Sequence, residues 1–295
     1  MTSPITYSTV KARIDQLTKS FRFLKKQRIG TSCFGRALEA LFFGYGKKVL
    51  IMTACHHGSE HLTAALLTDF AEELALCLEA GERRFGLDLR ALLECFCLVL
   101  VPIVNPDGMA LATEGLGSAP IRRRQTLVAL NRGCDDFTHW QANGRGVDLN
   151  HNYDFGFCAY KKIERECGIT AGPTKFSGAY PESESETRAI CRLVRQNERH
   201  LAAVFSFHSQ GEVIYYHPSP QTRRAAFLLS QLTGYENAVA EGTAAYGGLT
   251  DWLSRGGIPS FTFEIGKGEN PLPDSLLPHL YATLREALFR SLTMF

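Results

Sequence analysis

Several features that would assign this chain to a specialised class of protein are missing from its sequence. It contains no Cys-x-x-Cys pair, so a zinc site built from cysteines is not expected. The nine cysteines are scattered, and most lie inside apolar runs, where a free thiol behaves as a small hydrophobic side chain. This usage is typical of a reducing compartment, and we therefore expect a cytoplasmic protein.

Long apolar runs and blocks of like charge are missing too. No window approaches the roughly 18 apolar residues of a membrane helix, and residues 1–8 carry no charged-then-apolar signal segment. The net charge is +2, with no basic run longer than residues 122–124. We therefore expect neither a membrane nor a nucleic acid as partner. A secreted protein trimmed of its signal would have the same sequence.

Repeats, low-complexity linkers and breaks in composition are absent, which predicts a single domain over residues 1–295. Short apolar runs with the length of buried strands alternate with segments of helical spacing. The strand runs cover residues 48–53, 96–104, 201–207, 213–216 and 260–265. The helical segments cover residues 7–27, 62–78, 183–197 and 276–292. This alternation predicts an α/β domain with a mixed, largely parallel central sheet flanked by helices on both faces.

Metal-binding side chains lie at the carboxyl ends of two predicted strands, where the active sites of such sheets gather. His57 and Glu60 follow the run 48–53, and their i, i+3 spacing around a strand-to-helix turn directs an imidazole and a carboxylate towards one ion. His208 ends the run 201–207 and faces the same crevice. Together the three residues predict a zinc site with one position left open for water, which is the catalytic pattern.

Glu264 is a carboxylate inside the apolar run 260–265, and burying an unpaired carboxylate is costly. It is either paired with an arginine of the core or acts as a general base beside the metal.

Two other interpretations of the first motif stay open. The segment also fits a polar turn rich in solvated histidines. If it does bind a metal, His56 and His61 are competing ligands. His57-x-x-Glu60-His61 further fits an inverted zincin motif, in which Glu60 is the base and His61 a ligand. That motif lies within a helix, whereas here a strand leads directly into it, and it leaves His208 unexplained.

Five motifs occur in the order found in zinc carboxypeptidases of the carboxypeptidase A-like family, and the chain resembles that family from about residue 7 to residue 265. They are His57-Gly-Ser-Glu60, Asn105-Pro-Asp-Gly108, Asn143-Gly-Arg145-Gly-Val-Asp148-Leu-Asn150, Phe207-His208-Ser209 and Phe263-Glu264. The resemblance implies one zinc ion on His57, Glu60 and His208. It also implies that Glu264 takes a proton from the attacking water and passes it to the leaving amine.

The resemblance implies further roles around the segment 143–150. Arg145 is similar to an arginine that stabilises the developing oxyanion, with Arg132 as the alternative. Asp148 resembles the carboxylate that orients a ligand histidine through its other ring nitrogen. Asn150 is similar to a residue that binds the terminal carboxylate of the substrate. The next residue departs from the digestive enzymes: it is His151 instead of an arginine fork, and histidine is mostly neutral near pH 7.

This departure resembles the bacterial γ-D-glutamyl-meso-diaminopimelate peptidases, which cut cell-wall stem peptides. The segments 140–150 and 246–252 are also similar to that branch. Tyr246 is then a candidate substrate-facing tyrosine, and Thr250 is expected to line the pocket for a polar residue such as diaminopimelate. The expected partner is therefore a peptidoglycan stem peptide. The alternatives are a carboxypeptidase for ordinary C-termini, an amino-acid deacylase of the same fold, and a non-catalytic binding module.

Overall fold

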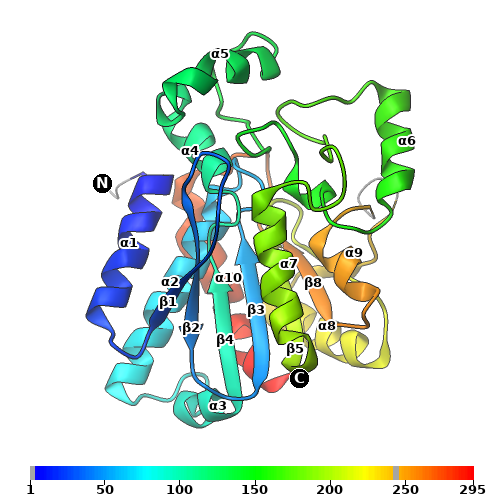
Figure 1. The fold of residues 1–295 in the computed structure, drawn as a ribbon. Helices are drawn as coiled ribbons and strands as arrows, with labels where there is room; N and C mark the ends of the chain where they lie inside the picture. Colours follow the sequence, from blue (N-terminus) through cyan, green and yellow to red (C-terminus); the bar gives the residue numbers. More distant parts are fainter. Residues whose placement is uncertain (1–3, 242–245) are drawn as a thin grey trace.

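One eight-stranded sheet runs through the computed structural model, which describes residues 4–241 and 246–295 (Figure 1). Its strands are β1 (Lys25–Thr31), β2 (Ala37–Phe43), β3 (Lys48–Ala54), β4 (Phe96–Val101), β5 (Leu201–His208), β6 (Val213–Tyr216), β7 (Glu236–Ala238) and β8 (Ser260–Glu264). Their spatial order is β1-β2-β4-β3-β5-β8-β6-β7. The central strands β4, β3, β5 and β8 are parallel, and antiparallel pairs join β1 to β2, β2 to β4 and β6 to β8. The predicted mixed sheet with a parallel centre is confirmed.

Helices cover both faces of this sheet. They are α1 (Tyr7–Ser20), α2 (His61–Ala80), α3 (Leu89–Cys95), α4 (Pro106–Glu114), α5 (Ile121–Leu130), α6 (Phe157–Cys167), α7 (Ser185–Asn197), α8 (Pro220–Thr233), α9 (Leu249–Ser254) and α10 (Leu277–Arg290). Figure 1 shows α7 in front of the strands and α10 behind them. The apolar residues of α2 and α10 form one core with the sheet, and those of α7 and α9 form another. The architecture is a single α/β domain.

Some elements differ from the sequence-based prediction. The helix expected over residues 7–27 ends at Ser20, and the chain then enters β1, whose polar side chains lack the apolar pattern of a buried strand. The segment 105–108 begins α4, although its Asn-Pro-Asp-Gly sequence is typical of a turn. Asn105 accepts a hydrogen bond from the Gly108 N–H at 2.8 Å, and Pro106 occupies the first turn. Asparagine before a helix and proline at its first position are both favoured, so the residues that signal a turn here start a helix.

Two observations concern the thiols and the helices. All nine cysteines are free. Among the described residues, no helix combines the length and the apolar character that crossing a membrane requires.

Candidate active site

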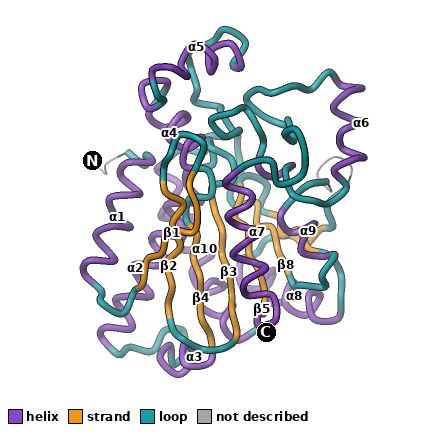
Figure 2. The backbone as a smooth tube through the Cα atoms, viewed as in Figure 1, coloured by secondary structure: helices purple, strands orange, loops and turns teal. Residues whose placement is uncertain are grey.

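Three adjacent parallel strands carry the candidate residues to one edge of the sheet. His208 is the last residue of β5 and stands opposite Glu264, the last residue of β8. Ala54 ends β3 opposite Phe207 of β5, so the loop that follows brings His57 and Glu60 to the same edge. Figure 2 shows that the longer loops gather at one end of the strands. The carboxyl ends of parallel strands meet at one edge, which is why residues far apart in the sequence converge here.

His57, Glu60 and His208 form a compact cluster, and their donor atoms all lie within 4.8 Å of one another. His57 Nδ1 is 2.9 Å from Glu60 Oε1, and His208 Nδ1 is 3.1 Å from Glu60 Oε2. The two Nδ1 atoms are 3.4 Å apart. Both imidazoles therefore turn the same ring nitrogen towards the centre of the cluster.

The second nitrogen of each ring has its own partner. His57 Nε2 is 3.1 Å from Asp148 Oδ1, and His208 Nε2 is 3.2 Å from the Ser206 hydroxyl. Asp148 is itself fixed, because its Oδ2 accepts a hydrogen bond from the Lys175 N–H at 2.9 Å. Such contacts on the outer nitrogen set the orientation and tautomer of a ligand histidine. The structure thus places Asp148 where the resemblance implied.

The residues of this cluster fit a zinc ion. Two imidazole nitrogens and a carboxylate are donors that zinc accepts, and donors about 2.0–2.1 Å from a tetrahedral ion lie roughly 3.3 Å apart. The separations in the cluster run from 2.9 to 3.4 Å. Burial alone would raise the pKa of Glu60, but His57 and His208 outweigh it and lower that pKa to about 2. The carboxylate is therefore charged near neutral pH and available as a ligand.

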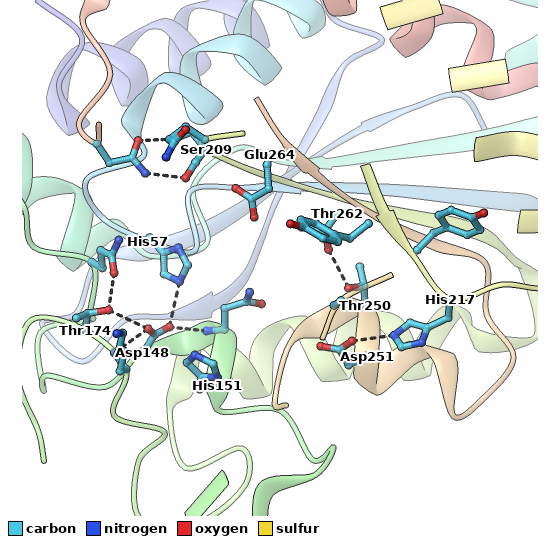
Figure 3. A pocket seen from close by; sticks show the side chains of 18 of the residues that line it. His57, Asp148, His151, Thr174, Ser209, His217, Thr250, Asp251, Thr262 and Glu264 are labelled. Atoms are coloured by element: carbon cyan, nitrogen blue, oxygen red, sulfur yellow. Dashed lines mark hydrogen bonds and ion pairs between the residues drawn. The ribbon is translucent and has the colours of Figure 1, made fainter. Parts of the chain in front are cut away.

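Glu264 lines the same cavity as His57 (Figure 3). Burial raises its pKa to about 7; the nearby His208 opposes this rise and Glu60 adds to it. A base works best when its pKa lies near the working pH, so this carboxyl group is suited to exchanging protons. Glu264 makes no ion pair with an arginine among the described residues, contrary to the alternative of a core pair.

The two competing histidines point elsewhere. His61 Nε2 is 2.8 Å from Asp274 Oδ1, away from the cluster. His56 Nε2 is 3.0 Å from the Tyr153 hydroxyl, and its ring stacks on His208. Burial, reinforced by His208, holds the pKa of His56 well below its usual range, so its ring is neutral. The placement of His61 speaks against the inverted zincin interpretation.

The cavity has a volume of about 640 Å³, and Asn150, His151 and Thr250 line it as expected. Figure 3 shows a polar end away from His57, where Thr250 and Thr262 lie with their hydroxyl oxygens 2.8 Å apart. Beside them, Asp251 Oδ1 accepts a hydrogen bond from His217 Nε2 at 2.7 Å if that nitrogen is protonated. This end of the cavity therefore offers hydroxyls, a carboxylate and an imidazole.

His151 is held by two neighbours. Its Nδ1 lies 2.8 Å from the backbone oxygen of Tyr246 and donates to it, and its ring stacks on Tyr160 with centroids 4.2 Å apart. The ring is thus fixed at the cavity wall, with only Nε2 left to meet a ligand. It does not reproduce the two parallel donors of an arginine fork.

Two predicted residues are not brought to the cavity. Arg145 is 53% exposed at its side chain, and its Nε lies 3.6 Å from Glu184 Oε2. It occupies the tip of a turn in which Asn143 Oδ1 accepts from the Arg145 N–H at 2.9 Å, so the guanidinium faces outwards. The ring of Tyr246 packs against Gly156, where an added Cβ would lie 2.2 Å from the ring. This placement does not support the oxyanion role of Arg145 or the substrate contact of Tyr246.

The cavity is also lined by residues to which the sequence assigned no role. They are Gln141, Lys175, His217, Asp251 and Thr262, among others. Gln141 and Asp251 lie within segments that resembled the cell-wall branch, which was the available signal. Lys175 and His217 stand in irregular loops, and nothing in their local sequence connects them to the cavity.

Comparison with known proteins agrees with this geometry. The sequence profile of the family described as zinc carboxypeptidase matches residues 10–287. Gamma-D-glutamyl-L-diamino acid endopeptidase 1 of Lysinibacillus sphaericus is 32% identical over 281 residues, which are 93% of this chain and 69% of that protein. Human carboxypeptidase B is 25% identical over 288 residues, 88% of this chain and 62% of that protein.

Solved structures share the fold. Bovine thrombin-activatable fibrinolysis inhibitor, bound to a tick carboxypeptidase inhibitor, matches with a TM-score of 0.70 at 22% identity, over 98% of this chain and 95% of that one. Murein-tripeptide amidase MpaA from Escherichia coli O157 matches with a TM-score of 0.53 at 20% identity, over 88% and 90%. Taken with the profile match and the His-Glu-His cluster, these findings show that the chain belongs to the zinc carboxypeptidase family and is a zinc metallopeptidase.

Proposed function

We propose that this enzyme hydrolyses the amide bond between γ-D-glutamate and meso-diaminopimelate in soluble cell-wall stem peptides. In this proposal residues 1–295 are one catalytic domain, and His57, Glu60 and His208 hold the zinc ion. Asp148 fixes the ring of His57, which it meets at 3.1 Å. A cytoplasmic location, expected from the free cysteines, is part of the same proposal.

The residues divide the chemistry between them. The contribution of zinc at such sites is Lewis acidity, which polarises a carbonyl and lowers the pKa of water. Glu264 takes a proton from the attacking water, whose oxygen bonds to the scissile carbonyl carbon. As the C–N bond breaks, Glu264 returns that proton to the leaving amine. Burial raises the pKa of this carboxyl group, which favours the return of the proton to the leaving amine.

The polar end of the cavity is the observation that carries the substrate assignment. Diaminopimelate ends in a carbon that bears both an ammonium and a carboxylate. The buried carboxylate of Asp251 is complementary to the ammonium, and the hydroxyls of Thr250 and Thr262 are suited to the carboxylate. His217, which is hydrogen-bonded to Asp251, lines the same end of the cavity. An aliphatic or aromatic residue would offer these groups no hydrogen bond beyond those they make to one another.

Two further points support the same substrate. The L. sphaericus relative carries the name of a γ-D-glutamyl-L-diamino acid endopeptidase. His151, pinned by Tyr246 and Tyr160, does not offer the arginine fork that suits an ordinary C-terminal carboxylate.

A side-by-side assay tests this proposal. We expect a higher kcat/KM for L-Ala-γ-D-Glu-meso-diaminopimelate than for a hippuryl-amino-acid carboxypeptidase substrate. Thr250→Val keeps the shape of the side chain and removes its hydroxyl, so it should lower kcat/KM for the stem peptide and not for hippuryl-phenylalanine. Preference of the wild-type enzyme for the hippuryl compound would refute the cell-wall substrate and leave the metallopeptidase assignment standing.

A further inference from the structure

A second cavity, of about 560 Å³, adjoins the one that holds the candidate active site. His151, Thr174 and Lys175 line both cavities, so the two meet at these residues. Beyond them the second cavity continues between α6 and the segment 168–175, with Tyr160 and Arg132 on its walls. The second cavity therefore lies directly beside the first, across these three residues.

The two cavities differ in charge. Four acidic residues line the first, namely Asp148, Asp251, Glu264 and Glu269. Among the described residues that line the second there is no aspartate or glutamate, whereas Arg132 and Lys175 both line it. Neither of these cations forms an ion pair with another described residue. A cavity with uncompensated positive charge attracts an anionic group.

The position of His151 decides which part of the substrate reaches this cavity. Residue 151 stands next to Asn150, which the family resemblance relates to the terminal carboxylate of the substrate. The ring of His151 lies flat on Tyr160, at 10° between the planes, and its Nδ1 is bonded to the Tyr246 carbonyl. At this point the cavity wall is therefore an imidazole with one free nitrogen. It lacks the arginine fork that would hold a terminal carboxylate, so the bound peptide does not have to end there.

We infer that the second cavity accepts a carboxyl-terminal extension of the substrate, and that Arg132 and Lys175 bind the carboxylate at the end of that extension. A guanidinium offers two parallel hydrogen bonds to a carboxylate, and the ammonium of Lys175 adds a mobile point charge. The bond that is hydrolysed stays the same. The enzyme then acts as an endopeptidase. Its substrates carry one further residue after the residue that supplies the amine of the cleaved bond. This inference rests on the proposed peptidase activity and not on the cell-wall substrate.

A comparison of two stem peptides tests the inference. One is L-Ala-γ-D-Glu-meso-diaminopimelate, and the other carries an additional D-alanine. The quantity measured is the KM of the longer peptide divided by the KM of the shorter one. We expect Arg132→Gln and Lys175→Met each to raise this ratio about fivefold, the upper range for an exposed ion pair. Arg122→Gln and Lys162→Met are matched controls, because both side chains are exposed and outside the two cavities.

Arg132→Gln is the decisive variant, because Arg132 lines only the second cavity. Amidation of the terminal D-alanine should abolish the difference between Arg132→Gln and the wild type. An unchanged ratio in Arg132→Gln, or an equal rise of KM for both peptides, would overturn the inference.

Failure of this inference can be distinguished from failure of the proposed function. If the wild type cleaves neither stem peptide but does cleave hippuryl-phenylalanine, the cell-wall substrate is wrong. The same ratio is then measured with hippuryl-phenylalanine and hippuryl-phenylalanyl-alanine. Calorimetric binding of each peptide pair to Glu264→Gln protein gives the ratio of Kd values without turnover, so slow catalysis does not leave the inference undecided.

Discussion

His57 Nε2 lies 3.1 Å from Asp148 Oδ1, and this ring nitrogen faces away from Glu60 and His208. Burial opposes ionisation of Asp148, but the neighbouring His57 lowers its pKa well below the usual range. The carboxylate therefore stays charged and holds the ring so that Nδ1 points at Glu60 and His208.

Replacement of this carboxylate should weaken metal binding. Asp148→Asn keeps the size of the side chain and removes its charge, and we expect zinc affinity to fall by roughly 10–100-fold. Competition with a chromogenic chelator measures this affinity. Asp154→Asn is the matched control, because the Asp154 side chain is 58% exposed and far weaker in its contacts. Equal affinities of Asp148→Asn and the wild type would show that Asp148 does not position the ligand.

The pKa of Glu264 predicts how activity depends on pH. Burial raises this pKa to about 7 in the metal-free protein, and the unprotonated carboxylate is the form that accepts a proton. A zinc ion nearby favours the charged form, so the pKa should be lower in the zinc-loaded enzyme. We therefore expect kcat/KM to fall below a midpoint that is under pH 7. Carbon-13 NMR of the glutamate side chains should show a resonance titrating near 7 without zinc, and it should be missing in Glu264→Gln.

Loss of the base itself is the companion measurement. Glu264→Gln should bind zinc as the wild type does and lose nearly all turnover, whereas Glu236→Gln, on an exposed edge strand, should keep both. A Glu264→Gln enzyme with substantial turnover would remove Glu264 from the proposed mechanism.

Gln141 and Arg145 can be compared directly as hydrogen-bond donors to the oxyanion. Gln141 lines the cavity, and its Oε1 accepts a hydrogen bond from Thr174, which leaves its amide N–H groups free to donate. Arg145 faces Glu184 instead. We expect Gln141→Ala to lower kcat by roughly 10²–10³-fold, the usual loss for one such donor, and Arg145→Ala to lower it much less. The reverse order would restore the role that the sequence predicted for Arg145.

The raised pKa of Glu186 predicts a pH-dependent change in stability that is independent of catalysis. Burial, with a smaller contribution from Asp107, raises its pKa from 4.5 to about 7. The folded state thus favours the protonated form, and this stabilisation is complete below pH 4.5 and lost as the pH rises through 7. Glu186→Gln mimics the protonated form and still accepts the hydrogen bond from the Cys33 N–H. The variant should gain about 3 kcal/mol on the wild type between pH 5 and pH 8.

Thermal unfolding at several pH values measures this gain. Glu198→Gln, on the exposed turn after α7, is the control and should show no such pH dependence. A difference in Tm between Glu186→Gln and the wild type that does not change with pH would contradict the prediction.

The sequence was most informative where side chains follow buried parallel strands. His57, Glu60, His208 and Glu264 could be predicted because the carboxyl ends of such strands meet at one edge. The same logic does not extend to Lys175, which reaches the cavity from a loop between α6 and α7. Loop positions depend on tertiary contacts that leave no periodic pattern in the sequence.

The placement of Arg145 did not follow from its neighbourhood in the sequence. Arg145 lies three residues before Asp148 in a matching motif, yet it faces outwards. Asn143 Oδ1 accepts hydrogen bonds from the N–H groups of both Arg145 and Val147, which forms a tight turn with Arg145 at its tip. An asparagine followed by glycine is a known turn signal.

The most direct test of the zinc peptidase assignment is a zinc titration of metal-depleted protein, with peptide hydrolysis as the readout. We expect no activity without zinc and a linear rise that ends at one zinc per chain. His208→Ala should stay inactive across the titration while its thermal unfolding shows a folded domain, because the two apolar cores do not include the metal cluster. Hydrolysis by the metal-free wild type, or a His208→Ala protein that responds to zinc as the wild type does, would contradict it.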